Sequence, residues 1–315
     1  MTSSEITSGA MRAVVVEAYE GLSGMEIQKI TVPEPRPGHA LIRVHSAGVN
    51  PIDLKVAKGV LNAKFPTPLP LISGCEIAGS VAALSDSDTE WQVGDDIHAL
   101  LGYTGAFADY VLVPLENLVR KPLSMSFTEA AAMPSAVGTS QAVLDSGKVG
   151  EGSCIVIHAA AGGVGSILVQ LAKARGAHIT ALASSANLNY VAALGADVVV
   201  DRNGDKVSEI RNADVVIDAF GPATHERSWA MLRPGGALIS LVSPPSTEMA
   251  EKHKVHALHV FGDRNPENLR NADRLFMAGK LRVHVTQRFP LERFRDALQL
   301  IESGRTRGKI VLDIA

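Results

Sequence analysis

The sequence is poor in cysteine and in aromatic residues. Its 315 residues include two cysteines, and aromatic residues make up 4% of the chain. Small secreted domains that rely on disulfides carry several cysteine pairs, and Cys75 and Cys154 cannot supply them. The composition therefore argues against a disulfide-stapled secreted scaffold.

The chain also lacks a long apolar run and a strong charge of either sign. No stretch reaches the roughly 20 apolar residues of a membrane-spanning helix, and the start of the chain lacks the layout of a signal peptide. The formal net charge of -3 gives no electrostatic reason to expect nucleic acid or a membrane as a partner. We expect a soluble, cytoplasmic protein that is long enough for two domains.

Short apolar segments separated by proline and glycine fill the first part of the chain. Strand-like runs lie at 11–16, 41–44, 77–84, 97–101 and 108–113, and only 51–58 and 127–132 have helical character. Many short strands joined by glycine and proline turns are typical of a β-rich, barrel-like domain. We assign this domain to residues 11–125.

A strand, a glycine turn, a helix and a second strand follow one another in the middle of the chain. Residues 154–158 form an apolar, β-branched run, and apolar side chains then recur at helical spacing from Val164 to Ala172. Gly176 supplies the stop, and 179–183 is the next buried strand. The pattern predicts a βαβ crossover.

The turn of this unit, AAGGVG at 160–165, matches the dinucleotide-binding fingerprint with an alanine in the first glycine position. The second glycine lets the backbone approach a pyrophosphate, the third lets the helix pack close to the strand, and N–H groups at the helix start face the anion. We predict that Ala161, Gly162, Gly163, Val164 and Gly165 bind a dinucleotide cofactor. A turn with a structural role alone is the alternative.

The end of the second strand indicates which dinucleotide is bound. An NAD-binding site has a carboxylate there for the ribose, whereas this chain has Ser184 and Ser185 and no acidic residue before Asp197. This favours NADP(H). We predict that the two serines bind the 2′-phosphate and that Arg202 supplies charge; a solvated loop arginine is the alternative.

The rest of the chain first continues this alternation and then returns to the earlier style. Strand candidates at 198–200, 215–219, 237–242 and 255–261 bring the number from Cys154 onward to the six of a doubly wound sheet, and Gly235-Gly236 is predicted as the turn before the fifth. A strand at 283–289, an amphipathic helix at 291–302 and a strand at 309–314 follow. We expect this last stretch to fold back onto the first domain.

Seven segments, taken in chain order, resemble the medium-chain dehydrogenase/reductase superfamily and, within it, the zinc-independent quinone oxidoreductase branch related to zeta-crystallin. They are SAGVNPID at 46–53, GCEIAG at 74–79, VGDD at 93–96, GAFADYV at 105–111, the glycine turn, RPGG at 233–236 and GRTRGKIV at 304–311. The resemblance implies an α/β protein with a GroES-like catalytic domain (11–125, completed by 280–315) and a Rossmann NADP-binding domain (126–279). It also implies an active site in the cleft between these domains.

The resemblance places zinc ligands at three positions that this chain fills differently. Zinc-dependent members carry a Cys, a His and a further Cys or Asp where this chain has Asn50, Cys75 and Ser135. Catalytic zinc needs three Cys, His or carboxylate ligands, and Cys75 with Glu76 cannot supply them. The four-cysteine lobe that holds structural zinc is also missing. We predict a site without metal.

Loss of zinc changes the expected reaction, because the metal is the Lewis acid that stabilises an alkoxide. Hydride transfer to quinones or α,β-unsaturated carbonyls, which spread the charge themselves, is then favoured. We predict that Asn50 orients the ribose or the substrate and that Lys55 or Tyr103 donates a hydrogen bond to the acceptor. An exposed helix lysine is the alternative for Lys55.

Further cofactor contacts are implied by the resemblance or by position. Thr139 matches a threonine near the nicotinamide, and Lys309 matches a basic position near the far end of the cofactor. Phe220, Leu241 and Val242 follow the fourth and fifth strands, at the carboxyl edge where ligands bind. Ordinary packing or a surface role is the alternative for each.

Other polar residues are predicted to have structural roles. Asp53 fixes a turn or pairs with a basic group, and Cys75 is a small residue that lines the cleft. The histidines 253, 256 and 259 have ligand-like spacing, but they overlap the sixth strand candidate and are assigned to structure.

The predicted function is a zinc-independent, NADPH-dependent oxidoreductase that transfers hydride to quinones or α,β-unsaturated carbonyls. The alternatives are a zinc-type alcohol dehydrogenase and a low-turnover NADPH-binding protein of structural or RNA-binding type. The resemblance further implies a homodimer, formed through the sheet edge near residues 255–261.

Overall fold

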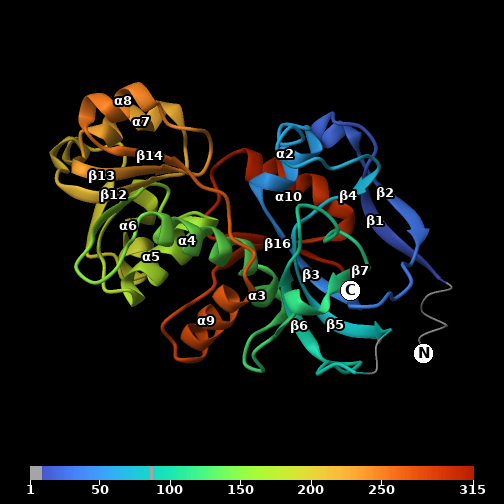
Figure 1. Ribbon diagram of the computed structural model, residues 1–315. Coiled ribbons are helices and arrows are strands. Elements are labelled where there is room, and N and C mark those ends of the chain that lie inside the picture. The colour runs from blue at the N-terminus through green and yellow to red at the C-terminus, as the bar shows by residue number, and fades with distance from the viewer. Residues whose placement is uncertain (1–8, 86–87) are drawn as a thin grey trace. The chain divides into compact units, whose positions relative to one another are not determined.

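The computed structural model describes residues 9–85 and 88–315 (Figure 1). They form two compact units. The first contains the described parts of Met1–Ser135 together with Arg264–Asp273 and Val283–Ala315, and the second contains Ala136–Asp263 and Arg274–Arg282.

The first unit contains two sheets. In spatial order, the smaller antiparallel sheet consists of β2 (Met25–Thr31), β1 (Ala10–Val16) and β4 (Leu71–Ile72). The larger sheet consists of β15 (Val285–Pro290), β16 (Lys309–Asp313), β3 (His39–Val49), β5 (Glu76–Leu84), β6 (Asp96–Leu100) and β8 (Val119–Arg120), and β7 (Tyr110–Pro114) pairs with β3. Its helical segments are η1 (Gly21–Gly24), α2 (Pro51–Ala57), η2 (Leu115–Asn117), α3 (Phe127–Ala131), η5 (Leu291–Arg293) and α10 (Phe294–Glu302).

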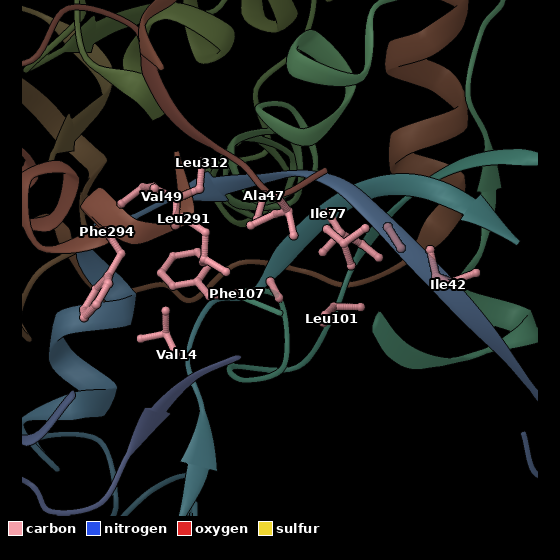
Figure 2. Close-up of a cluster of buried hydrophobic side chains, with 14 of the residues drawn as sticks. Val14, Ile42, Ala47, Val49, Ile77, Leu101, Phe107, Leu291, Phe294 and Leu312 are labelled. Carbon is pink, nitrogen blue, oxygen red and sulfur yellow. The ribbon is translucent and has the colours of Figure 1, made fainter. Parts of the chain in front are cut away.

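The C-terminal strand completes this unit, as expected. β16 pairs antiparallel with β3, and Ile310 lies opposite Val49. Figure 2 shows apolar side chains from strands and helical segments far apart in the sequence gathered around Phe107, which is fully buried. Because β3 is covered by both early and late segments, the polar residues at its end are withdrawn from water.

The second unit is a six-stranded parallel sheet with helices on both faces. Its spatial order is β11 (Val198–Asp201), β10 (His178–Ala183), β9 (Cys154–Ile157), β12 (Ala213–Asp218), β13 (Leu232–Ser240) and β14 (His256–His259). Its helical segments are α4 (Pro134–Ser146), α5 (Gly163–Ala174), η3 (Ser185–Asn187), α6 (Leu188–Ala193), η4 (Asp205–Glu209), α7 (Pro222–Trp229) and α8 (Thr247–His253). The first two residues of α4 belong to the first unit, and α9 (Pro266–Met277) belongs to the first unit up to Asp273 and to the second from Arg274. In this unit, α4 and α5 cover one face of the sheet, and α7 and α8 cover the other face (Figure 1).

The strand order fixes where a ligand can bind in the second unit. β9 lies between β10 and β12, so the winding of the chain reverses between β9 and β12. In doubly wound sheets, dinucleotides bind outside the carboxyl ends of the strands at this reversal. The predicted α/β fold class, with a GroES-like first domain and a Rossmann sheet, is confirmed.

Some elements were predicted wrongly or were missed. Gly235 and Gly236 are not a turn before the fifth strand but lie inside β13, where the pairing with β12 shifts register. A bulge accommodates Gly235 because its φ of 79° suits glycine. The helices α4, α8 and α9 were not predicted. No helix in the described part of the chain is long and apolar enough to cross a membrane.

Candidate functional site

The glycine turn lies between β9 and α5, as the fingerprint predicts. Ala159 starts it with a φ of 52°, and its carbonyl oxygen accepts a hydrogen bond from Gly162 N at 2.9 Å. A Cβ added to Gly165 would lie 2.2 Å from this oxygen. Glycine is therefore required at 165 by the close approach of helix and strand.

Gly162 differs from Gly165 in how closely the protein packs against the position of a Cβ atom. A Cβ at Gly162 would meet the Ala159 oxygen alone, at 3.3 Å, and the backbone has an ordinary φ of -78°. The packing of the protein opposes a side chain much less there than at Gly165, whereas a pyrophosphate approaching the backbone requires glycine. Gly162 also precedes the first turn of α5, whose N–H groups can bind an anion. The turn thus fits a dinucleotide.

The carboxyl end of β10 carries hydroxyl groups and no carboxylate. Ser184 Oγ accepts a hydrogen bond from Asn187 Nδ2 at 3.0 Å, and Ser185 is exposed. Arg202 lies beside this end, because its N–H donates to Ala183 O at 2.8 Å. The structure therefore brings the three residues predicted to bind a 2′-phosphate to one edge of the sheet.

The loops after β12 and β13 lie at the same edge. The guanidinium of Arg202 is 5.4 Å from the ring centre of Phe220, which is 39% exposed although it is large and apolar. Val242 is 37% exposed, and a Cβ on Gly221 would lie 3.4 Å from Val242 Cγ1. Leu241 is half-buried, and its N–H donates to Asp218 O at 2.9 Å. These side chains form an apolar edge suited to the ring systems of a nucleotide.

Thr139 lies in α4, where a late segment of the chain passes close to it. A Cβ on Gly262 would lie 2.9 Å from Thr139 Oγ1, and Asp263 N donates to Gly138 O at 3.1 Å. Thr139 is half-buried. Its contact with the nicotinamide stays a prediction.

In the first unit, Asn50 and Asp53 form the start of α2. Asn50 N donates to Asp53 Oδ2 at 2.7 Å, which is one half of a capping box. The prediction that Asp53 fixes a turn is confirmed. Asp53 Oδ1 has no hydrogen-bond partner among the described residues, and burial raises the pKa of this carboxyl to about 7.

The amide of Asn50 is held at both ends by a buried ion pair. Lys309 Nζ donates to Asn50 Oδ1 at 2.5 Å and to Glu76 Oε1 at 2.6 Å, and Asn50 Nδ2 donates to the same Glu76 oxygen at 2.7 Å. Glu76 is 0% and Lys309 is 4% exposed. The ammonium of Lys309 is thus engaged inside the first unit, and its predicted cofactor contact stays untested.

The three positions at which zinc-dependent relatives were expected to carry ligands do come together here. Asn50 Nδ2 lies 3.5 Å from Cys75 Sγ, and Ser135 N donates to Glu76 Oε2 at 2.7 Å. Burial raises the pKa of the Cys75 thiol well above its usual value, so its metal-binding thiolate is disfavoured. In residues 9–85 and 88–315, no three His, Cys, Asp or Glu side chains are placed to hold a metal ion.

The two predicted donors, Lys55 and Tyr103, are both half-buried in the first unit. Burial lowers the pKa of Lys55, which lies in α2 two residues after Asp53. The Tyr103 ring is 4.7 Å from the ring of Phe65, and the guanidinium of Arg264 lies over it at 4.4 Å. Lys55 is therefore not the fully exposed lysine of the alternative interpretation.

Sequence reasoning missed the central role of Glu76. The residue was considered as an insufficient metal ligand, whereas in the structure it binds Asn50, Lys309 and the backbone of Ser135. A signal was present, since a carboxylate at the start of an apolar strand needs a buried partner. The identity of that partner, 233 residues away in the chain, depends on the pairing of β16 with β3.

Comparison with known proteins agrees with this architecture. Residues 36–123 match the alcohol dehydrogenase GroES-like domain, and residues 194–312 match a family described as zinc-binding dehydrogenase. The chain is 30% identical to the chloroplastic quinone-oxidoreductase homolog of Spinacia oleracea, over 96% of this chain and 98% of that protein. It is 29% identical to the chloroplastic NADPH-dependent alkenal/one oxidoreductase of Arabidopsis thaliana, over 96% of this chain and 79% of that protein.

Solved structures show the same relationship. The quinone oxidoreductase from Coxiella burnetii superposes with a TM-score of 0.88 at 29% identity, covering 97% of this chain and 100% of that one. The fold, the glycine turn and these full-length similarities lead to one family. The chain belongs to the medium-chain dehydrogenase/reductase superfamily, and it is an oxidoreductase similar to the quinone oxidoreductases of that superfamily.

Proposed function

We propose that this protein is a zinc-independent, NADPH-dependent reductase of quinones or α,β-unsaturated carbonyls. The observation that carries the cofactor assignment is the open backbone at Gly162 beside an edge that has Ser184, Ser185 and Arg202 in place of a carboxylate. The bound cofactor supplies a hydride. The names of the relatives from spinach and Arabidopsis support the acceptor class.

The residues of the second unit divide the binding work. The N–H groups from Ala161 to Gly165 would face the pyrophosphate, and Arg202 with the two serines would bind the 2′-phosphate. Phe220, Leu241 and Val242 would pack against the nucleotide rings. Thr139 would lie near the nicotinamide.

The first unit provides the groups for the acceptor. Its polar cluster offers an amide, a hydroxyl, a buried thiol and an ammonium already bound to Glu76, a set that suits no catalytic zinc ion. An acceptor that spreads charge over its own conjugated system needs a hydrogen-bond donor at its oxygen. Lys55 and Tyr103 are the proposed donors, and Asn50, whose amide is fixed by Glu76 and Lys309, is the proposed orienting group.

Steady-state kinetics test the cofactor assignment. NADPH and NADH consumption is measured over a panel of quinones and enones, with wild type and Arg202→Ala. We expect a preference for NADPH and a KM for NADPH that rises about tenfold in Arg202→Ala, because a charge-assisted phosphate contact is lost. A preference of wild type for NADH would contradict the assignment, and binding without turnover would favour the low-turnover alternative.

The donor assignment is tested with Lys55→Met and Tyr103→Phe. Loss of the true donor lowers kcat for a quinone about 10²-fold. Lys58→Met and Tyr110→Phe are matched controls, because Lys58 pairs with Glu302 and Tyr110 lies in β7, where it packs against an apolar cluster that includes Leu41. If both donor variants keep the kcat of wild type, neither residue is the donor. Zinc bound in one equivalent would instead favour the alcohol dehydrogenase alternative.

We further infer a homodimer. β14 pairs with β13 on one side and is the last strand in the sheet order, so one edge of the sheet is available for pairing. Light scattering coupled to gel filtration measures the mass in solution. A mass near 33.2 kDa would mean a monomer and contradict the proposal.

A further inference from the structure

The helix α7 turns a polar face toward the carboxyl edge of the parallel sheet. Thr224, His225 and Ser228 lie on this face, and they are 6%, 6% and 0% exposed. Buried polar groups require partners, and a fully bonded network makes its surroundings rigid. Each of the three side chains bonds a residue at or just after the end of a strand.

Thr224 contacts Asp218, the last residue of β12. The hydroxyl of Thr224 donates to Asp218 Oδ2, and Asp218 Oδ1 accepts from Phe220 N at 2.8 Å and Gly221 N at 2.7 Å. Asp218 is completely buried. This carboxylate therefore sets the course of the loop that carries Phe220.

His225 joins this loop to the next one. Its Nε2 lies 3.3 Å from Ser240 Oγ and 3.7 Å from Asp218 Oδ1. Ser240 is the last residue of β13, and its Oγ accepts from Val242 N at 3.3 Å and Ser243 N at 3.4 Å. One imidazole nitrogen thus hydrogen-bonds the side chain that folds the loop after β13 and lies beside the side chain that folds the loop after β12.

Ser228 reaches the third loop, which is the glycine turn. Its Oγ donates to Thr224 O at 2.8 Å, so it accepts from His158 Nε2 at 3.1 Å. His158 directly precedes Ala159, the left-handed residue at the start of the turn. His158 is 2% exposed, and its Nδ1 has no hydrogen-bond partner among the described residues. The single bond to Ser228 therefore orients this ring.

We propose that Thr224, His225 and Ser228 are positioning residues that hold the three turns of the cofactor edge at a fixed spacing. This inference rests on the proposed function, because these three turns are the predicted contacts of NADP(H). Affinity for NADP(H) then depends on side chains of α7 that lie behind the turns. A ligand that bridges three loops binds well when the loops are already in place, since no ordering is left to be done.

The experiment combines binding with amide hydrogen exchange in the full chain. His225→Gln and Ser228→Ala are compared with His178→Gln and Ser208→Ala, which make the same chemical changes at exposed sites. The dissociation constant for NADPH is measured by calorimetry, and exchange is followed in 159–165, 219–222 and 241–244. If His225→Gln does not fold, Ser240→Ala removes the same hydrogen bond.

The expected pattern differs between the two variants. His225→Gln accelerates exchange in both 219–222 and 241–244, whereas Ser228→Ala accelerates it in 159–165. Each raises the dissociation constant about tenfold, which corresponds to about 1.4 kcal/mol. KM for NADPH rises with kcat unchanged at saturation, as expected for binding lost equally from ground and transition states.

Two failures can be told apart. If wild type binds NADPH, and the α7 variants match their controls in affinity and exchange, the positioning role is wrong while the proposed function stands. If wild type does not bind NADPH, the proposed function fails, and so does the claim that α7 sets NADP(H) affinity.

Discussion

The two units each enclose a buried polar network, and the networks are of different kinds. The first unit holds the side-chain amide of Asn50 between Glu76 and Lys309, with Asp53 on the backbone N–H of Asn50, and an ion pair lies at its centre. The second unit connects hydroxyl and imidazole groups to one carboxylate, Asp218. Charges require a counter-charge within reach, whereas neutral groups require well-placed hydrogen bonds. The first network is therefore sensitive to single charge changes, and the second to geometry.

The largest expected effect is at the ion pair. Lys309→Met leaves the fully buried carboxylate of Glu76 without its cation, and we expect a loss of about 3 to 5 kcal/mol in the free energy of unfolding. Chemical denaturation measures it. The double variant Lys309→Met with Glu76→Gln recovers a large part of the lost free energy of unfolding, because no unpaired buried charge remains. Lys58→Met, at the exposed pair with Glu302, changes stability by about 1 kcal/mol or less.

A double variant as unstable as Lys309→Met would show that charge is not what makes this network sensitive. The contrast between the two units would then be wrong at its main point.

The next effect is a pH dependence that arises from Asp53 in the first unit. Burial raises the pKa of Asp53 to about 7, against its usual value near 4. Between these values the unfolded carboxyl is ionised while the folded one keeps its proton, so stability falls as pH rises through this window. The slope is on the order of 1 kcal/mol per pH unit. Asp53→Asn removes this slope and keeps an oxygen that can accept from Asn50 N.

Unfolding of wild type and Asp53→Asn from pH 4 to 8 measures this difference. The free energy of unfolding of the variant, relative to that of wild type, should increase with pH up to about pH 7 and stay constant above it. A constant difference across the range would show that Asp53 is ionised in the folded protein throughout.

His158 in the second unit gives a dependence of opposite sign. Burial lowers its pKa to about 4, so between this value and about 6.5 the unfolded imidazole is protonated while the folded one is neutral. Stability therefore falls as pH decreases through that window. Asp218, Arg227 and His225 are the charged or titratable groups around it, and the first opposes the shift.

His158→Gln keeps an N–H donor for Ser228 and does not titrate. As pH falls from about 6.5 to 4, we expect the free energy of unfolding of the variant to rise relative to that of wild type, on the order of 1 kcal/mol per pH unit. Hydrogen exchange of amides within the second unit reports the change locally. Parallel pH profiles for variant and wild type would contradict a neutral buried His158.

The smallest change in stability is expected at the glycine turn. Gly162→Ala adds a Cβ that meets one atom at 3.3 Å, so we expect a change of about 0.5 kcal/mol or less, together with weaker NADPH binding. Gly165→Ala places its Cβ 2.2 Å from Ala159 O and should destabilise the protein clearly. Equal loss of stability in both variants would mean that Gly162 serves packing and not a ligand.

Most of the fold could be predicted from local sequence patterns. Alternating strand and helix periods indicated six parallel strands, and the run from 309 to 314 was recognised as a strand of the first domain. The long helix α4 was missed because its small and apolar residues give a weak amphipathic pattern, and the register shift in β13 depends on its pairing with β12. Both features arise from packing against segments distant in the sequence.

The candidate site was predictable where one segment carries the whole signal. The turn at 160–165 and the serines after β10 each lie within one segment, so spacing and residue type sufficed to select them as candidates. The capping box of Asn50 and Asp53 is equally local, but it was not predicted. The ion pair of Lys309 with Glu76 and the contacts of α7 with three loops join residues from distant segments. The local sequence around each of these residues does not predict its partner.

Short-range patterns in the sequence were enough to predict a glycine turn of dinucleotide-binding type on a doubly wound sheet. The resemblance added the prediction that an amide, a thiol and a hydroxyl stand where zinc-dependent relatives carry ligands. The tertiary structure alone decided that an internal ammonium, and not an exposed one, neutralises the carboxylate beside that amide. The physical reason is that backbone turns are encoded by short-range steric rules, whereas the pairing of buried charges depends on which distant strands align.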